Sequence, residues 1–481
     1  MPNSSVQVLG KRLFSAGDQD LFARLAGDFN PIHMDPLAAR RSLAGGVVVH
    51  GVHVLLWSLD TFARAVTCVV VVNSLNVIFP EPLFLGEEIE LLLQRSNADE
   101  FELMAVTGKR KVAIIRLGLR SDSATTLRPS EPLCDSAPLL PVGEPALQSF
   151  EDLAGMTGTV GFVAHAAEFV AAFPSAAKLI GAERLRETAA CSRLVGMVCP
   201  GLQSVFAELS LEWSTWDASS HLRYVVEETD PRFSLVRMRV ESEATSGNIT
   251  AFCPPAPPRQ PAIAELAELV RNDEFKHQTA LVIGGSRGLG ELTAKAIAAG
   301  GGRLLITYVV GKDEAAAVAE EIRGFGGYAQ IFPYDVTQSA PRQFAWLAEN
   351  TPSHVYYFAT FRISQARSAA FSPSLLERFL MFYVNGFYDL CRGLRESGVN
   401  RAVLFWPSSV FVTDRPKELT EYAMAKAAGE ILCANIPNIF RGFRVHQSRL
   451  PRLLTDQTNM VGPQNLPRAV DVMLPIIRAM K

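Results

Sequence analysis

The chain has 481 residues, of which 48% are hydrophobic and 20% charged, and its formal net charge is −3. This length exceeds what one hydrophobic core usually holds, so two or three domains are expected. The nearly balanced charge gives no electrostatic reason to expect nucleic acid or an anionic membrane as a partner. Seven cysteines without paired short spacing predict reduced thiols, and with no signal peptide apparent the expected location is cytoplasmic. No metal site is predicted.

The first distinctive segment, 27–33, places Asp28 and His33 on either side of Asn30-Pro31. Proline fixes its own backbone and disfavours helix in the residue before it, so a rigid turn is expected. Such a turn can direct a carboxylate and an imidazole at one point, as general acid/base catalysis requires. Asp-x4-His by itself is more often an ordinary turn, so the neighbouring sequence has to decide.

Residues 51–65 are apolar on nearly every side, which predicts a buried helix. The run 66–72 is too short to span a bilayer and predicts a buried strand. An antiparallel meander is expected from the strand-like segments 69–72, 89–93, 101–106 and 112–119, which turn residues separate.

Three motifs of this region occur in a recognisable order: Phe14-Ser15-x2-Asp18-x3-Phe22-Ala23, Gly27-Asp28-Phe29-Asn30-Pro31-Ile32-His33 and His50-Gly51. Residues 1–120 thereby resemble the MaoC-like (R)-specific enoyl hydratase/dehydratase family. The resemblance implies a hot-dog fold in which Asp28 and His33 are catalytic. It also implies that the amide of Gly51 binds the thioester oxygen.

Residues 121–149 are rich in Ser, Pro, Thr and Asp and are predicted to be a linker. Residues 150–252 weakly repeat the first domain, with a central helix at 189–198 and strands at 204–213, 221–227 and 233–240. Ser192-Arg193-x2-Gly196-Met197-x2-Pro200-Gly201-Leu202 also resembles the MaoC-like group. This half has no Asp-x-Asn-Pro-x-His motif, so the prediction is an α+β double hot-dog with one catalytic half.

The segment 253–258 is proline-rich, and it is predicted to begin a linker that ends in a helix at 262–275, within 253–277. The next domain, 278–481, begins with a strand at 279–283, a glycine-rich loop and a helix at 291–299, followed by a strand at 303–308. Glycines in such a loop let the backbone approach a pyrophosphate at a helix N-terminus. An α/β Rossmann-type doubly wound parallel sheet is therefore expected.

The loop spacing G-x3-G-x-G, together with Tyr422-x3-Lys426, Ser409 and Asn385, resembles the short-chain dehydrogenase/reductase family over about residues 278–456. The resemblance implies that Ser409 holds a carbonyl, Asn385 supports a proton relay and Lys426 lowers the pKa of the donor Tyr422. It also implies that the cofactor contacts Gly284, Ser286, Arg287, Gly288, Leu289, Gly290, Tyr308, Asp335, Val336, Tyr422 and Lys426.

The expected cofactor is NADPH, because no acidic residue follows Tyr308 before Asp313 and Arg287 can meet a 2′-phosphate. Three departures from the family pattern are Ile283 before the first glycine, Tyr357-Phe358-Ala359-Thr360 after the fourth strand and Pro451-Arg452 after the sixth. The first two remove polar groups from the floor of the site, and the third alters the nicotinamide side.

The two resemblances together imply reduction of a 3-oxoacyl thioester to the (R)-3-hydroxyacyl thioester and its dehydration to the trans-2-enoyl thioester. The acyl group would be carried by acyl carrier protein or coenzyme A, in fatty acid or polyketide-like biosynthesis. A homo-oligomer formed through the reductase domain is expected. Two alternatives stay open: hydration followed by oxidation, and a reductase-like half that is silent or acts on another carbonyl.

Overall fold

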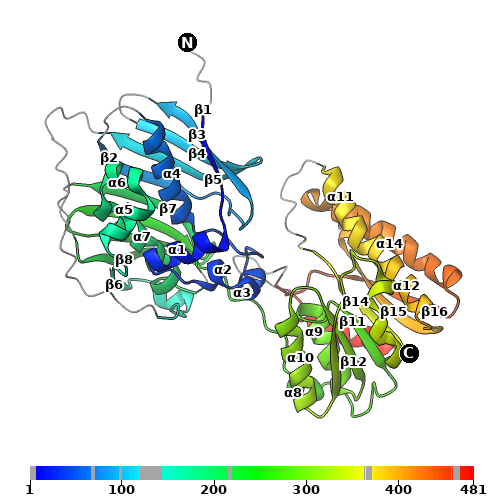
Figure 1. Cartoon of the computed structure of the whole chain (residues 1–481). Coiled ribbons are helices and arrows are strands. Elements are labelled where there is room, and N and C mark those ends of the chain that lie inside the picture. Colours follow the sequence, from blue (N-terminus) through cyan, green and yellow to red (C-terminus); the bar gives the residue numbers. More distant parts are fainter. Residues whose placement is uncertain are drawn as a thin grey trace. The chain divides into compact units, whose positions relative to one another are not determined.

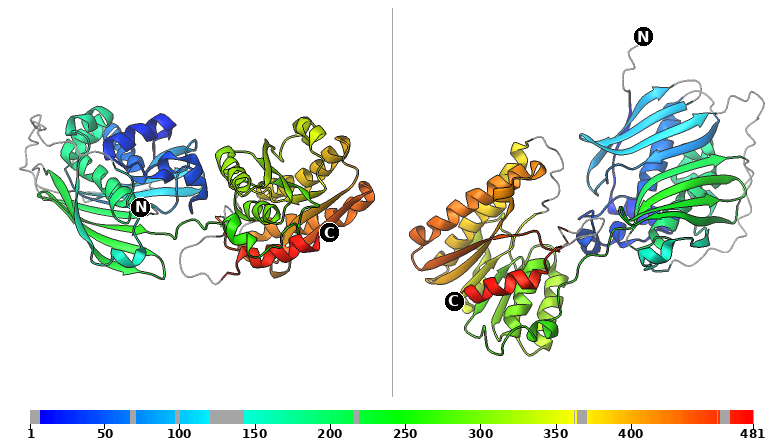
Figure 2. Two further views of the ribbon diagram at one scale, coloured as in Figure 1. Left: turned by 90° about the horizontal axis from the view of Figure 1, so that it is seen from below. Right: turned by 180° about the vertical axis from the view of Figure 1, so that it is seen from behind.

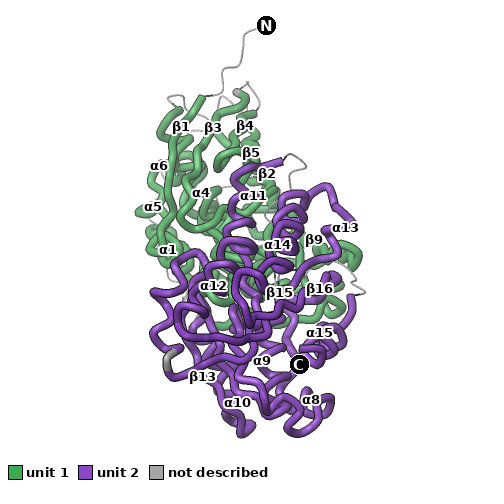
Figure 3. The backbone as a smooth tube through the Cα atoms, turned by 90° about the vertical axis from the view of Figure 1, so that its right-hand side faces the viewer, with its two compact units in different colours: residues 1–256, 460–463 green, residues 257–459, 464–481 purple. Residues whose placement is uncertain are grey.

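The computed structural model describes residues 7–66, 71–96, 100–119, 143–202, 204–214, 219–361, 363, 371–456, 458 and 466–480. The chain forms two compact units, residues 1–256 with 460–463 and residues 257–459 with 464–481 (Figure 3). The main boundary falls after Ala256, inside the proline-rich segment 253–258. Most of the predicted linker, its residues 121–142, lies outside the described residues.

Unit 1 contains one antiparallel sheet of ten strands in the order β1-β3-β4-β5-β2-β7-β10-β9-β8-β6. Its strands are β1 (Gln7–Leu13), β2 (Val72–Ile78), β3 (Glu88–Ser96), β4 (Glu100–Thr107), β5 (Arg110–Leu119), β6 (Thr157–Gly161), β7 (Val205–Trp213), β8 (His221–Asp230), β9 (Leu235–Glu241) and β10 (Thr245–Phe252). From each outer edge inward, both halves follow the same order of first, third, fourth, fifth and second strand. The halves join where β2 pairs with β7, with Val77 opposite Leu209. This pairing hides one edge of each half from other chains.

The helices of unit 1 gather on one face of this sheet (Figures 1 and 2). They are α1 (Ala16–Ala26), α2 (Pro31–Met34), α3 (Pro36–Arg41), α4 (Gly51–Ala65), α5 (Ala166–Ala172), α6 (Pro174–Ile180) and α7 (Ala182–Arg193), which a π-helical turn at Leu194–Val198 continues; a 3₁₀ turn at Phe150–Leu153 precedes β6. In α4 the side chains of Leu55, Leu59 and Phe62 are fully buried. Burial of each such side chain stabilises the fold by about 1.5–3 kcal/mol, which explains why this apolar helix lies in the core.

The structure confirms the helix predicted at 51–65 and the strands at 89–93, 101–106 and 112–119. Of the strand predicted at 69–72, Val72 begins β2 and Val71 precedes it, while residues 67–70 lie outside the described residues. The second central helix begins at Ala182, seven residues earlier than predicted from Ala189. Its first turns carry Arg and Glu side chains, which hid a buried helix from a hydrophobicity pattern.

Unit 2 is built on a parallel sheet of six strands in the order β13-β12-β11-β14-β15-β16. The strands are β11 (Thr279–Ile283), β12 (Arg303–Tyr308), β13 (Tyr328–Pro333), β14 (His354–Tyr357), β15 (Ala402–Ser409) and β16 (Phe443–Leu450). Counted along the chain, this order is 3-2-1-4-5-6, that of a doubly wound Rossmann-like sheet. Ligands of such sheets bind outside the carboxyl ends of the strands, where the order reverses between β11 and β14.

Helices cover both faces of the parallel sheet. Alternate residues of β11 therefore lie in two separate hydrophobic cores, Val282 in one and Leu281 in the other. The first core is covered by α8 (Ile263–Ala267), α9 (Gly288–Ala299), α10 (Lys312–Gly324) and α15 (Ala469–Ala479), and the second by α11 (Pro373–Leu380), α12 (Gly386–Glu396) and α14 (Thr420–Ile439). Shorter turns lie at Ala340–Gln343, Ala345–Glu349, Met381–Asn385, α13 (Phe411–Asp414) and Lys417–Leu419. The helix predicted at 262–275 is only α8, and turns follow it.

Candidate functional site

The segment 27–33 leaves helix α1 through Gly27, whose φ of 72° is the left-handed conformation that glycine adopts at helix ends. Asn30 then caps α2, and its Oδ1 accepts the backbone N–H of Ile32 at 3.1 Å. Pro31 is the first residue of α2, where its missing N–H costs nothing. The turn predicted from Asn30-Pro31 is therefore present, and it places Asp28 before α2 and His33 within it.

The carboxylate of Asp28 is almost fully buried. Its Oδ2 accepts a hydrogen bond from Ser192 Oγ at 2.7 Å, and its Oδ1 accepts one from the amide of Asn30 at 3.2 Å. Burial raises the pKa of Asp28, while His33 and these two donors oppose that rise. A raised pKa lets this carboxyl group hold or release a proton closer to neutrality.

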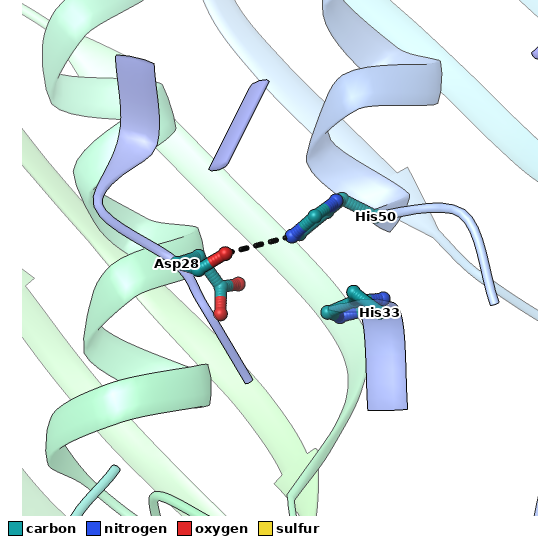
Figure 4. A group of neighbouring side chains, drawn as sticks. All are labelled: Asp28, His33 and His50. Carbon is teal, nitrogen blue, oxygen red and sulfur yellow. Dashed lines mark hydrogen bonds between the residues drawn. The ribbon is translucent and has the colours of Figure 1, made fainter. Parts of the chain in front are cut away.

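His33 and His50 stack, with ring centroids 3.9 Å apart and planes inclined by 26°. Figure 4 shows the two imidazole rings one above the other beside Asp28. His33 Nδ1 lies 2.7 Å from the carbonyl oxygen of Val48, so Nδ1 carries the proton and Nε2 keeps its lone pair in the neutral ring. Burial lowers the pKa of His33, which favours that neutral form. The dyad thus offers one proton carrier and one base.

Asp28, His33 and His50 each offer one ligand atom within 4.8 Å of the others, a spacing at which such groups can bind a metal ion. Imidazole lone pairs lie in the ring planes, and two planes inclined by 26° at 3.9 Å separation do not meet at a metal–nitrogen distance of about 2.1 Å. In addition, His50 Nε2 is 3.0 Å from the main-chain oxygen of Asp28. The arrangement suits proton transfer rather than metal coordination.

The second half of unit 1 supports this site directly. Asn30 Nδ2 donates to the carbonyl oxygen of Gly196 at 2.7 Å, and more weakly to those of Gly201 and Leu202 at 3.2 Å. A Cβ on Gly196 would lie 2.3 Å from Asp28 Oδ1. The glycine is therefore required for the close approach of the carboxylate.

A second contact between the halves runs in the reverse direction, from the first half to the second. Asp60, on the first central helix α4, accepts the backbone N–H groups of Ser175 at 2.7 Å and Ala176 at 3.0 Å. Polar side chains of both central helices thus reach the other half: Ser192 of α7 bonds a carboxylate, and Asp60 of α4 bonds a helix N-terminus. A helix terminus satisfied in this way is a structural contact, in line with the missing Asp-His motif in this half.

Gly51 is the first residue of α4, after His50 as the N-cap. Amides in the first helical turn have no acceptor within their own helix and lie at the positive end of the helix dipole. This position is compatible with the oxyanion-binding role that the resemblance implies. The ring of Phe79 lies 3.2 Å from the point where a Cβ of residue 51 would be.

The glycine-rich loop of unit 2 connects the end of β11 to α9. Gly284 and Gly288 have φ values of 76° and 59°, and a Cβ on Gly290 would lie 2.2 Å from the oxygen of Gly284. This cradle at a helix N-terminus fits a dinucleotide pyrophosphate. Ser286 and Leu289 belong to the same loop and first turn.

Hydroxyl groups lie beside the two segments, Ile283 and 357–360, in which the chain lacks the polar residues of the short-chain dehydrogenase/reductase pattern. Thr307 Oγ1, on β12, accepts the amide of Gly284 at 3.1 Å, beside Ile283. Thr360 Oγ1 and Tyr383 Oη are 2.6 Å apart after the altered segment 357–360. Neighbouring elements thus place hydroxyl groups beside both altered segments.

The residues assigned to the adenosine side lie in the glycine-rich loop and at the ends of two strands. Tyr308 ends β12, and Asp335 and Val336 follow β13. Arg287 contacts an acid of the chain itself, because its Nη1 is 3.2 Å from Oδ2 of Asp456, beyond β16. No local pattern indicates this ion pair, since 169 residues separate its members.

Ser409 and Tyr422 meet in unit 2, where Ser409 forms a hydrogen bond with the phenol. Burial raises the pKa of Tyr422 to about 12, and the bond with Ser409 opposes the rise. Lys426 Nζ donates to the carbonyl of Pro407 at 2.6 Å and lies 3.9 Å from the ring centroid of Tyr383. Burial lowers the pKa of Lys426 to about 7. The expected lowering of the Tyr422 pKa by Lys426 is therefore wrong for this structure.

Asn385 ends the π-helical turn Met381–Asn385 and its side chain is exposed. Within the described part of unit 2, its side chain forms no hydrogen bond to Ser409, Tyr422 or Lys426. Tyr383, two residues earlier, instead packs against Tyr422, with ring centroids 5.7 Å apart. Sequence reasoning missed Tyr383 and, in unit 1, Gln19, because ordinary buried residues show the same local pattern. It included Ser192 and His50 in motifs but assigned neither a role in the site.

Comparisons with known families agree with this division of the chain. The MaoC like domain matches residues 6–115, and the short chain dehydrogenase domain matches residues 278–351. The chain joins a MaoC-like region to a short-chain dehydrogenase region. These two regions indicate an enzyme with dehydratase and oxidoreductase parts. No curated protein matches the chain.

Solved structures similar to this chain include FolM alternative dihydrofolate reductase 1 from Brucella suis, in complex with NADP. It is 17% identical, with a TM-score of 0.35, over 37% of this chain and 74% of its own. Another is the angucycline C-6 ketoreductase LanV with bound NADP, 21% identical, with a TM-score of 0.34, over 38% of this chain and 76% of its own. In the described part of the chain, no helix has the length and apolar character needed to cross a membrane.

Proposed function

We propose that unit 1 is a double hot-dog (R)-specific hydratase/dehydratase and that unit 2 is an NADPH-dependent 3-oxoacyl-thioester reductase. The observation that carries the first assignment is the hydrogen bond from His33 Nδ1 to the Val48 carbonyl beside the buried Asp28 carboxyl group. It leaves His33 Nε2 as the base of the pair.

In the dehydration direction, His33 Nε2 takes the acidic C2 proton of the (R)-3-hydroxyacyl thioester. The protonated Asp28 carboxyl group gives its proton to the C3 hydroxyl, which leaves as water while the C2–C3 double bond forms. The amide of Gly51 stabilises the enolate-like oxygen of the thioester. The opposite pKa shifts of Asp28 and His33 support this, because burial favours a neutral pair over an ion pair. Hydration follows the same steps in reverse.

In unit 2 the glycine loop and the start of α9 would hold the pyrophosphate, and NADPH would supply the hydride. Tyr422 would donate a proton to the carbonyl oxygen, which Ser409 would orient. The proposed product, an (R)-3-hydroxyacyl thioester, is a substrate for unit 1. The carrier is coenzyme A or acyl carrier protein, and assays with both decide between them.

A second candidate is a reductase-like unit that is silent or acts on another carbonyl. The contact that favours it is the one from Lys426 to the Pro407 carbonyl, since this lysine then points its charge at the protein. Fluorescence titration with NADPH, followed by turnover assays with short 3-oxoacyl thioesters, separates the candidates. Binding without any turnover supports the second candidate.

The direct experiment on the whole chain uses two variants. Asp28→Asn should abolish hydration of a crotonyl thioester while NADPH binding persists, and Tyr422→Phe should stop reduction while hydration persists. With a 3-oxoacyl thioester and NADPH, the wild type should form the trans-2-enoyl product. A mixture of the two variants should restore that sequence in solution. Near wild-type hydration by Asp28→Asn would refute the assignment of unit 1.

We also propose that the chain forms homo-oligomers through unit 2. Met424, Ile431 and Ile439 are exposed along α14, and apolar surface of this kind favours association. Sedimentation of Ile431→Glu should show a smaller species than the wild type. A monomeric wild type would contradict this proposal.

A further inference from the structure

Gln19, on α1, is a buried side chain that joins two backbone segments of the site. Its Nε2 donates to the carbonyl oxygens of Val48 at 2.9 Å and of His33 at 3.2 Å. The reverse orientation of the amide would place its oxygen against two carbonyl oxygens. Two acceptors therefore determine the orientation, and Oε1 faces His50.

The carbonyl of Val48 receives two donors, Gln19 Nε2 and His33 Nδ1. Gln19 thus holds the same oxygen that selects the His33 tautomer, and it also holds the backbone of His33 itself. Without this side chain, the α2 turn and the Val48 carbonyl lose their link through α1. The bond from the Val48 N–H to the Ile32 carbonyl at 3.2 Å would still join the two segments, but the oxygen that selects the His33 tautomer would lose one of its two donors.

His50 faces an acceptor with each ring nitrogen: Nε2 is 3.0 Å from the main-chain oxygen of Asp28, and Nδ1 is 3.3 Å from Gln19 Oε1. Burial, and then the neighbouring His33, keep the pKa of His50 well below its usual value, so the ring is neutral and has one N–H. The shorter contact takes that proton. His50 therefore donates to the backbone of Asp28 while its ring supports His33 by stacking.

We infer that Gln19 and His50 form a clamp, in which Gln19 holds the backbone of His33 and His50 holds that of Asp28. The clamp keeps the proton of His33 on Nδ1 and leaves Nε2 as the base. Both are positioning residues, because each acts on the dyad through a backbone carbonyl group. This inference rests on the proposed function of unit 1 for its kinetic consequence, whereas the tautomer can be measured in the resting protein.

The test compares Gln19→Met, which keeps the length of the side chain, with Gln278→Met in unit 2. Gln278 is equally buried and accepts the hydroxyl of Tyr356 at 2.9 Å, so the control removes a buried amide far from the dyad in sequence and in a separate unit. Gln19→Met should lower kcat for hydration of a crotonyl thioester about 10- to 100-fold with KM changed less than about threefold. Gln278→Met should leave hydration unchanged.

The decisive readout is nitrogen NMR of histidine-labelled protein, in which His33 is assigned by its loss in His33→Asn. The wild type should show a single Nδ1–H tautomer of His33, and Gln19→Met should show a mixture. His50→Phe keeps a ring against His33 but removes the bond to Asp28, and it should lose rate similarly. If Gln19→Met does not fold, the hydration rate of His50→Phe tests whether the clamp affects catalysis.

Unchanged kcat in both variants, or a His33 that stays entirely Nδ1–H in Gln19→Met, would overturn the clamp. A wild type without hydration activity would refute the proposed function instead. In that case the tautomer in the resting protein still decides whether the clamp exists.

Discussion

Ser192 Oγ donates a 2.7 Å hydrogen bond to Oδ2 of Asp28, although 164 residues separate the two in the chain. One half of unit 1 thereby holds the carboxylate of the other half. The second half is needed for the candidate site even though it has no Asp-His motif of its own. This contact also opposes the rise in the pKa of Asp28 that burial causes.

The variant Ser192→Ala tests that relationship. Removing the donor should raise the pKa of Asp28 further, because burial then acts with one opposing bond fewer. Since hydration requires the ionised carboxylate, the acidic limb of its pH profile should move to higher pH. Ser58→Ala is the matched control, because this equally buried hydroxyl bonds only the Val54 carbonyl of its own helix. An acidic limb that does not move would show that Ser192 leaves Asp28 unaffected.

Gly196→Ala should displace the Asp28 carboxylate, because the new Cβ would lie 2.3 Å from Oδ1. A displacement of about 1 Å can lower the rate about 100-fold, so hydration should fall by roughly that factor while NADPH binding stays unchanged. Gly143→Ala is the control, since among the described residues, its chain neighbours aside, no atom lies within 4 Å of its added Cβ. Full hydration activity in Gly196→Ala would mean that Asp28 is not held as described.

Asp456 should weaken the preference for NADPH, because its carboxylate competes with a 2′-phosphate for Arg287. We expect the wild type to prefer NADPH over NADH at least tenfold, which is about 1.4 kcal/mol. Asp456→Asn should increase that ratio, and Arg287→Ala should remove most of it, as measured by fluorescence titration. Asp471→Asn, which removes the same charge from an exposed pair with Arg468, should change nothing. Equal affinity of the wild type for both cofactors would refute the role of Arg287.

Lys426→Met should stabilise unit 2, most strongly at low pH. The folded-state pKa of Lys426 is about 7, below its ordinary value of 10.5. Below pH 7 the lysine is charged in both states and the burial penalty is complete. Between pH 7 and 10.5 only the unfolded chain keeps the proton, so wild-type stability rises with pH. Calorimetry should therefore show a larger gain in Tm at pH 6 than at pH 9.5.

The control for this change is Lys276→Met, at an exposed lysine, which should show no such pH-dependent difference. A gain in Tm that is the same at both pH values would mean that the ammonium is not penalised by burial. Loss of reduction in Lys426→Met is expected as well.

Much of this architecture could be read from the sequence because its signals are local. The apolar run of α4, the Asn30-Pro31 turn and the glycine loop before α9 act through neighbours a few residues away, so spacing and residue type are sufficient. Tyr422 and Lys426 share one helical face for the same reason. The predicted lowering of the Tyr422 pKa by Lys426 was wrong, because burial by distant elements shifts both pKa values.

The sequence by itself pointed to the side chains that we propose carry the chemistry, Asp28 and His33 in one unit and Ser409 and Tyr422 in the other. Only the tertiary structure decided how they are held: Asp28 by Ser192 from the other half, His33 through Gln19 and Val48, and Arg287 by Asp456. These contacts join residues 14 to 169 positions apart. Hydrogen bonds and desolvation act through space, and a linear pattern does not record which distant groups folding brings within reach.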